Sequence, residues 1–278
     1  MSYESKENSV DLGSPVTLFE FIYGLTEGDA YRYSTTVDAV TLAGRAWQPH
    51  NLKHSEITSA GSLDRSELTI TARSDIEVAR LFIAAPPSQP VVVNIWRGHA
   101  LTGLQGWDEF KRIWTGRVLN TAWLEADVEF KCEPIATSAK RVGLRRNYQY
   151  GCPHVLYGTA CTVSELANTA QAKVVSVINS ATLVLQLLSP PAEVTAARLL
   201  GGVFKLTLST GRQVLRSITS AQIVAGGVQV SLMSGVPEAA VGLRCSVSRG
   251  CRHTFDDCRT FNNASNFGGC PNIPTKDA

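Results

Sequence analysis

Short runs in which apolar and polar residues alternate cover most of this chain, and this feature restricts its fold most. Seven such runs in the first half lie within residues 16–24, 30–36, 39–48, 67–73, 91–98, 113–124 and 128–134. Successive side chains of a β-strand point to opposite faces, so a period of two predicts strands that bury one face. Gly, Asp and Asn between the runs suit tight turns. We therefore expect an antiparallel barrel or sandwich.

A second group of alternating runs follows an interval that lacks the pattern. These runs lie within residues 172–178, 181–188, 202–221, 223–233 and 241–248. The turn sequences at residues 208–212 and 225–227 are typical of hairpins. About 80 residues suffice for a small antiparallel β barrel. The sequence thus predicts an all-β protein, built mainly of antiparallel barrels or sandwiches, with one or two short helices.

One of these helices is expected over residues 74–85. Ser74 can cap its first turn, Asp75 and Glu77 suit the positive end of a helix, and Pro86 stops it. The tail from Gly250 has neither a strand nor a helix period, and we expect it to be extended.

The distribution of alternating runs and of cysteines along the chain predicts three parts. Residues 1–135 form an N-terminal β-rich domain. Residues 136–164 and 249–278 form a cysteine-bearing connector, and residues 165–248 are a β module inserted into it.

Charge and hydropathy exclude some classes of protein. The net charge of +2, from 26 basic and 24 acidic residues, is too balanced for a protein that mainly neutralises a nucleic-acid backbone. No apolar run approaches the roughly 18 residues of a membrane span, and the polar first residues lack a signal-peptide pattern. We expect a protein that is neither inserted in a membrane nor exported.

Seven cysteines, an odd number, suit reduced thiols better than a disulfide framework. Cys152 and Cys161 precede the second β module, and Cys251 and Cys258 follow it. If the ends of the module meet, four thiolates converge, which suits Zn²⁺ or an iron–sulfur cluster. The gaps of eight and six residues are wider than most zinc knuckles and favour the cluster. The alternative is that these cysteines are simply small buried side chains.

The other three cysteines are set apart from this group. Cys132 and Cys245 stand in strand patterns at positions that alternation would bury. Cys270 lies in a turn-rich stretch, where it either packs or serves as a spare ligand.

Several other polar residues invite a functional interpretation. His154 and His253 follow proposed ligands and either support the metal or pack in loops, whereas His50, His54 and His99 have no hydrolase partners at recognisable spacing. Asp256 and Asp257 are expected to be solvated. The basic cluster Lys140, Arg141, Arg145 and Arg146 is expected first to offset the charge of a thiolate-bound metal. The alternatives are a solvated face, or a contact with DNA in a tail lumen or with an acidic neighbouring subunit. No nucleotide-binding motif is present, and we expect no enzymatic activity.

These segments resemble a known family. The runs 143–161, 250–258, 261–269 and 271–274 resemble the C-terminal half of the phage baseplate hub or tail-tip family of siphophages and gene transfer agents, which is similar to the lambda-like tail-tip L protein. The runs 19–21, 31–33, 40–47, 67–71, 79–82, 91–99, 114–118 and 132–138 resemble its companion N-terminal domain. Cys270 departs from the pattern, because relatives usually carry an aromatic residue before the final proline.

The resemblance implies a structural virion protein of the phage tail tip, assembled in the host cytoplasm as a homotrimer. A structural 4Fe-4S cluster would be held by Cys152, Cys161, Cys251 and Cys258. The implied partners are the distal tail ring protein, the central hub or tip protein and the tape-measure protein, with DNA only passing through the lumen. Two alternatives stay open: an intracellular four-cysteine zinc-binding interaction protein, and an iron–sulfur oxidoreductase.

Overall fold

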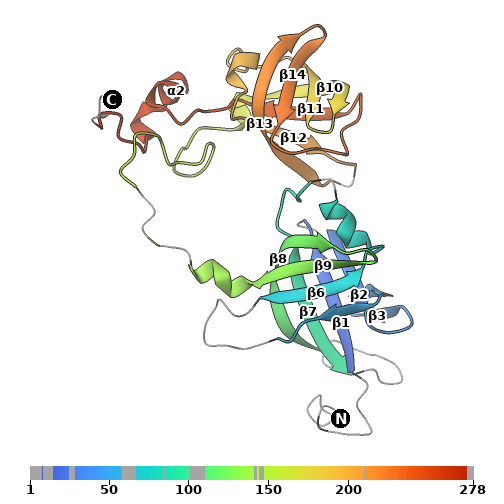
Figure 1. The fold of residues 1–278 in the computed structure, drawn as a ribbon. Helices are drawn as coiled ribbons and strands as arrows, with labels where there is room; N and C mark the ends of the chain where they lie inside the picture. The colour runs from blue at the N-terminus through green and yellow to red at the C-terminus, as the bar shows by residue number, and fades with distance from the viewer. Residues whose placement is uncertain are drawn as a thin grey trace. The chain divides into compact units, whose positions relative to one another are not determined.

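A computed structural model of the protein describes residues 8, 15–24, 29–57, 67–83, 85–99, 110–140, 143, 147–209 and 211–273, without the side chains of residues 138–140. The chain divides into two compact units (Figure 1). The first contains residues 1–83 and 89–141, and the second contains residues 84–88 and 142–278. Each unit is described by itself.

The first unit is built on a nine-stranded sheet. Its strands are β1 (Pro15–Ile22), β2 (Ala30–Ser34), β3 (Val40–Leu42), β4 (Arg45–Pro49), β5 (Leu52–His54), β6 (Leu68–Arg73), β7 (Val92–His99), β8 (Lys111–Trp123) and β9 (Asp127–Pro134). Their order is β3-β4-β2-β1-β7-β8-β9-β6-β5. The pairs are antiparallel apart from the short parallel contact between β2 and β4.

Alternation along β1 explains why both faces of this sheet are covered. Phe19 and Phe21 point into the larger hydrophobic cluster, which includes Phe130 of β9. Val16 and Leu18 point to the opposite face, where they pack with Trp47 and Phe110 among others. The two clusters stabilise the sheet by removing apolar area from water on either side.

A hairpin replaces one predicted strand of this unit. Residues 39–48 were expected to be a single strand, but β3 and β4 pair with each other, so the chain reverses between them. Ala43 and Gly44, at φ 47° and 74°, adopt the positive φ values that a tight two-residue turn requires.

The helix predicted over residues 74–85 is shorter in the structure, and it is a 3₁₀ helix instead of an α-helix. Only the 3₁₀ helix η3 (Glu77–Phe82) forms, and it has no side-chain cap. The amide of Ser74 bonds to the carbonyl of Ala126 (2.9 Å), so this residue belongs to a turn beside the sheet. Ile76 and Val78 are buried in the core, and their packing sets the path of the segment.

The second unit contains a closed six-stranded barrel (Figure 1). Its strands are β10 (Thr169–Asn179), β11 (Thr182–Leu188), β12 (Val203–Thr207), β13 (Gln213–Val224), β14 (Gly227–Leu232) and β15 (Arg244–Ser248), in the order β10-β11-β14-β13-β12-β15. β15 pairs with β10, so no edge strand is left exposed. Both predicted hairpin turns join neighbouring strands, β12 to β13 and β13 to β14.

At one position of the second hairpin, only glycine fits, because a side chain would clash with a neighbouring strand and the backbone has a positive φ. Gly227 has φ 152°, and a Cβ there would lie 2.2 Å from the carbonyl oxygen of Leu185 on β11. The barrel interior is filled by apolar side chains such as Leu183, Phe204 and Val230. The all-β prediction is confirmed.

Two segments outside the barrel, residues 147–168 and 249–273, are called here the cysteine lobe. It contains the 3₁₀ helices η6 (Leu166–Asn168) and η8 (Ala264–Asn266) and the helix α2 (Phe255–Thr260). The prediction of an extended tail is therefore wrong over α2. Thr254 caps this helix by accepting a hydrogen bond from the amide of Asp257 (3.2 Å), a signal too short to produce a helical period.

Two further 3₁₀ helices are η5 (Ile135–Lys140), at the end of the first unit, and η7 (Ala196–Arg198), beside the barrel. Among the described residues, no helix is both long and apolar enough to cross a bilayer. The finer division into connector and inserted module stays a prediction.

Candidate metal centre

The two halves of the cysteine lobe meet at one end of the barrel because the first and last barrel strands are neighbours. Thr169 of β10 lies opposite Ser248 of β15. Just beyond this pair, the amide of Arg249 donates to the carbonyl of Asn168 (2.9 Å). Farther out, the amide of Cys152 donates to the carbonyl of His253 (2.8 Å). Closure of the barrel thus carries the two cysteine pairs to the same place.

All four predicted ligands line one small cavity of about 20 Å³. Its walls are formed by Cys152, His154, Leu156, Cys161, Val163, Cys251, His253, Thr254, Cys258, Phe261, Asn263 and Asn266. None of these cysteines forms a disulfide. The cavity therefore holds four reduced sulfurs that come from segments about 90 residues apart.

Three of these sulfurs receive a hydrogen bond from an N–H group. The amide of His253 points at Cys251 Sγ (3.3 Å), and the amide of Gly268 points at Cys152 Sγ (3.5 Å). The side-chain amide of Asn263 lies 3.9 Å from Cys161 Sγ. Donors aimed at sulfur favour the thiolate, which is the form that binds a metal.

The fourth sulfur has a different partner. Cys258 is buried, and its thiol donates to the carbonyl of Asn263 (3.1 Å). Burial raises its pKa, and the neighbouring Cys152, Cys251 and Cys161 raise it further. Burial likewise raises the pKa of Cys251, with Cys161 and Cys152 among the other causes. The positive charge of a bound cation would offset this repulsion between thiolates, and its binding would displace the protons.

A buried arginine supplies positive charge beside the cavity. The side chain of Arg249 is only 4% exposed, and its guanidinium stacks 3.8 Å above the ring of Phe261. Burial lowers its pKa, whereas Cys251 is among the groups that raise it. A basic cluster was predicted to offset the negative charge of the thiolates. It lies outside the described residues, which lack Arg141, Arg145, Arg146 and the side chain of Lys140.

Asn263, like Arg249 beside the cavity, belongs to this site although no sequence motif pointed to it. It is buried, and its side-chain amide donates to the carbonyl oxygen of Cys161 (2.5 Å). Its own Oδ1 accepts from Asn266 Nδ2 (2.7 Å), which also reaches Thr162 Oγ1 (3.0 Å). The cluster of three asparagines at 262, 263 and 266 was the available signal, because Asn side chains often bridge loops that lack regular backbone bonds.

Both histidines of the lobe line the cavity and are held in one orientation. His154 Nδ1 lies 3.0 Å from the carbonyl of Asn266, and His253 Nδ1 lies 3.0 Å from the carbonyl of Cys152. A carbonyl can only accept, so each Nδ1 carries a proton and donates it to the loop that it contacts. The two rings thus support the loops of the cysteines.

The remaining cysteines do not line the cavity. Cys132 and Cys245 are 1% and 4% exposed inside their sheets, as predicted, and burial raises the pKa of each to about 12. Cys270 is half-buried, and its amide donates to the carbonyl of Gln149 (2.8 Å). The structure therefore places Cys270 near the first cysteine segment but outside the four-sulfur group.

The donor set fits a soft metal by its chemistry, since four thiols in a mostly enclosed cavity suit zinc or iron–sulfur and not magnesium or calcium. The cavity has room for about one water-sized group. Within the described ranges, no group of three or more His, Cys, Asp or Glu side chains is arranged to hold a metal ion. Side-chain rotation or small loop movement is needed before the sulfurs can share a ligand.

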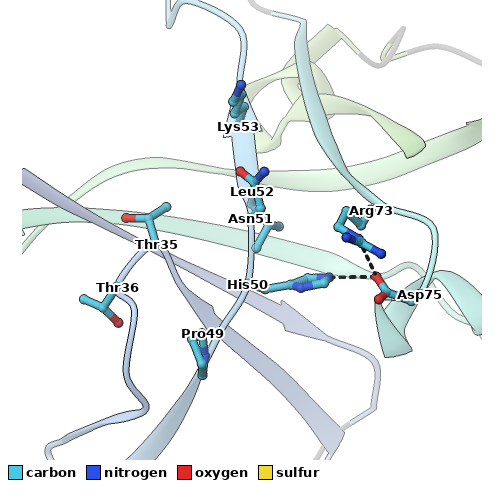
Figure 2. A pocket seen from close by; sticks show the side chains of 9 residues that line it. All are labelled: Thr35, Thr36, Pro49, His50, Asn51, Leu52, Lys53, Arg73 and Asp75. Carbon is cyan, nitrogen blue, oxygen red and sulfur yellow. Dashed lines mark ion pairs between the residues drawn. The ribbon is translucent and has the colours of Figure 1, made fainter. Parts of the chain in front are cut away.

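A second, larger cleft lies in the first unit (Figure 2). It measures about 620 Å³ and is open, with His50 and Asp75 facing each other in it. His50 Nε2 and Asp75 Oδ1 are 3.8 Å apart, too far for a hydrogen bond, and Asp75 also pairs with Arg73 (3.6 Å). Burial lowers the pKa of His50.

The hydroxyl groups of this cleft belong to Thr35 and Thr36, and both are engaged. Thr35 Oγ1 accepts from the amide of Thr17 (3.0 Å), and Thr36 Oγ1 donates to the carbonyl of Asp38 (2.8 Å). The histidines of this half were predicted to form no hydrolytic site, and the contacts of His50 give no reason to revise that prediction.

Comparison with known proteins gives two matches. The profile of a family described as phage conserved hypothetical protein BR0599 matches residues 198–277, which include the last four barrel strands and the second half of the cysteine lobe. No curated protein matches the chain. Among solved structures, the chain is similar to one from the virion of a native gene transfer agent particle, with a TM-score of 0.79 and 14% identity over 99% of this chain and 93% of that one. At this identity, the two chains share a fold.

Proposed function

We propose that this protein is a structural component of a phage-type tail, located at the baseplate hub or tail tip. The observation that supports it most is the fold shared with a gene transfer agent virion chain over 99% of the length of this protein. The family profile over residues 198–277 is also that of a phage protein. Because the similarity spans both units, it favours a protein from the same type of particle over an unrelated protein that shares only one domain.

The location at the tail tip follows from the resemblance of the cysteine segments to the hub family. In that role the protein is a homotrimer in the virion, formed in the host cytoplasm. It bridges the distal tail ring to the central tip proteins and meets the tape-measure protein, while DNA only passes through the lumen. Its work is assembly and not catalysis.

The same resemblance assigns a 4Fe-4S cluster to Cys152, Cys161, Cys251 and Cys258. When bound, the cluster supplies metal–sulfur bonds that join the two halves of the cysteine lobe. The amides of His253 and Gly268 would stabilise the thiolates, and Arg249 would offset part of their charge. The lobe needs such a link because it is short of apolar residues to bury.

Zinc is the second candidate for this site. The cavity of about 20 Å³ has the size of a single ion rather than of a cubane, and this observation favours zinc. The wide gaps between the cysteines of each pair favour the cluster. An iron–sulfur oxidoreductase is the third reading; it would require an electron partner or substrate that no observation here indicates.

Metal analysis of protein purified without oxygen separates these candidates. Iron with acid-labile sulfide, and a broad visible absorbance, are expected. A colourless protein with one zinc per chain would overturn the cluster and leave the tail function in place.

The tail function is tested by electron microscopy of particles from which the gene has been deleted. We expect tails that lack the tip or are not assembled, and we expect them to be restored by the wild-type gene. Complete tails with normal tips would contradict the proposal.

A further inference from the structure

Three arginines line a separate cavity of about 120 Å³ in the second unit. Arg198 belongs to η7 beside the barrel, Arg249 directly follows β15, and Arg252 precedes α2. Asp257 and Thr260 of α2 complete the polar part of the wall. None of the four cavity-lining cysteines described above contributes to its wall.

Arg249 anchors this cavity, and its hydrogen bonding is incomplete. One guanidinium nitrogen donates to the carbonyl of Thr260 (3.3 Å), another contacts the hydroxyl of Thr260, and Glu193 lies 3.5 Å away. Its Nε–H is also buried, and it has no hydrogen-bond partner in the part of the chain that the structure describes. A buried N–H of a cation without an acceptor is unfavourable unless something supplies one.

The charges at the cavity sum to an excess of positive charge. Glu193 pairs with both Arg198 and Arg249. The carboxylate of Asp257 accepts a hydrogen bond from the backbone amide of Arg252 (2.7 Å). Over the described residues, the guanidinium of Arg252 makes no ion pair. Three cations therefore face two carboxylates, and one unit of positive charge is left uncompensated.

Guanidinium groups match the geometry of carboxylate and phosphate oxygens, to which they donate in pairs. The volume of the cavity suits one such group and not a nucleotide or a sugar. We propose that Arg198, Arg249 and Arg252 form a binding site for a single oxyanion group, either a carboxylate or a phosphate. This site does not depend on the proposed tail function.

Solution NMR of the full-length protein tests the proposal directly. The Nε–H signal of Arg249, assigned by its loss in Arg249→Lys, is followed during titration with sodium phosphate and, separately, sodium acetate, with sodium chloride at equal ionic strength as the reference. We expect a saturable shift with at least one of the two oxyanions and none with chloride. Which of the two binds distinguishes a phosphate ligand from a carboxylate ligand.

Variants assign the effect to the site. Arg252→Gln is expected to weaken oxyanion binding by about tenfold, the usual worth of a charged hydrogen bond. Arg244→Gln, which removes an exposed arginine of β15 in the same unit, is the matched control and should leave the affinity unchanged. A rise in melting temperature with the same anion, absent in Arg252→Gln, gives a second readout. No shift with either oxyanion, or an equal loss in both variants, would overturn the proposal.

Discussion

The barrel and the cysteine lobe are adjacent parts of one unit, but different interactions hold them together. The barrel encloses a continuous apolar core in which side chains such as Leu185, Phe204 and Val247 are fully buried. In the lobe, by contrast, the buried residues among those described are Arg249, Gly250, Cys258 and Asn263. No large aliphatic or aromatic side chain is among them.

This difference shows how a segment without a core can still have a defined structure. The lobe is organised by single hydrogen bonds between its two halves, for example from Tyr157 Oη to the carbonyl of Arg249 (2.5 Å). A net hydrogen bond contributes only about 1 kcal/mol, whereas a structural metal site contributes on the order of 10 kcal/mol. We therefore expect the barrel to depend on burial and the lobe to depend on its ligand.

The largest expected effect comes from removing one sulfur of the cavity. Cys258→Ser should abolish metal binding and make residues 249–273 sensitive to protease, while the β-sheet circular dichroism is retained. Cys270→Ser is the matched control, because Cys270 does not line the cavity. Metal content and proteolytic cleavage are measured together. Equal metal loss in both variants would show that Cys270 is a ligand and that the four-sulfur assignment is wrong.

The second-largest effect is expected in the barrel, where the test removes a buried side chain instead of a metal ligand. Phe204→Ala removes a fully buried ring and should lower the free energy of unfolding by about 3–5 kcal/mol in urea denaturation. Val241→Ala, at an exposed position of the same unit, should change it by less than about 0.5 kcal/mol. If the two variants were equally stable, the barrel core would not be what holds this unit together.

The smallest expected effect is a change in how the free energy of unfolding depends on pH, which reports on the burial of one cysteine and not on metal binding. The buried thiol of Cys245 keeps its proton when folded, with a pKa of about 12, but loses it above about 9.0 when unfolded. Its contribution to stability is thus complete below pH 9 and is lost progressively as the pH rises towards 12. At pH 10 the loss is about 1.4 kcal/mol.

Cys245→Val removes this contribution and provides the comparison. Between pH 8 and pH 10, the free energy of unfolding should fall by about 1.4 kcal/mol less in the variant than in the wild type. The difference between the two proteins cancels the titration of all other groups. An identical pH dependence would mean that Cys245 is not buried as described.

Much of the fold could be predicted because period-two alternation reports directly on burial. It located most strands of both units, although not β5, and correctly buried Cys132 and Cys245. It failed where local geometry overrides the pattern. The reversal at Ala43 and Gly44 divides one predicted strand in two, and η3 follows the packing of Ile76 and Val78 instead of forming a full helix.

The candidate site was only partly predictable. The position of the cysteine pairs on either side of the barrel suggested that they converge, and the contact between β10 and β15 explains why they do. Asn263 and Arg249 were missed because their roles depend on contacts across more than 90 residues of sequence, such as those of Asn263 with Cys161 and of Arg249 with Tyr157. No local pattern reports such contacts.

The bond between the amide of Arg249 and the carbonyl of Asn168 has a consequence for how such a chain can evolve. The two residues that flank the barrel already touch, so the lobe would need only a short splice to close if the barrel were cut out. If the barrel is an inserted module, as the sequence predicts, it would be exchangeable: it could be enlarged, replaced or dropped while the sulfur-bearing loops keep their positions.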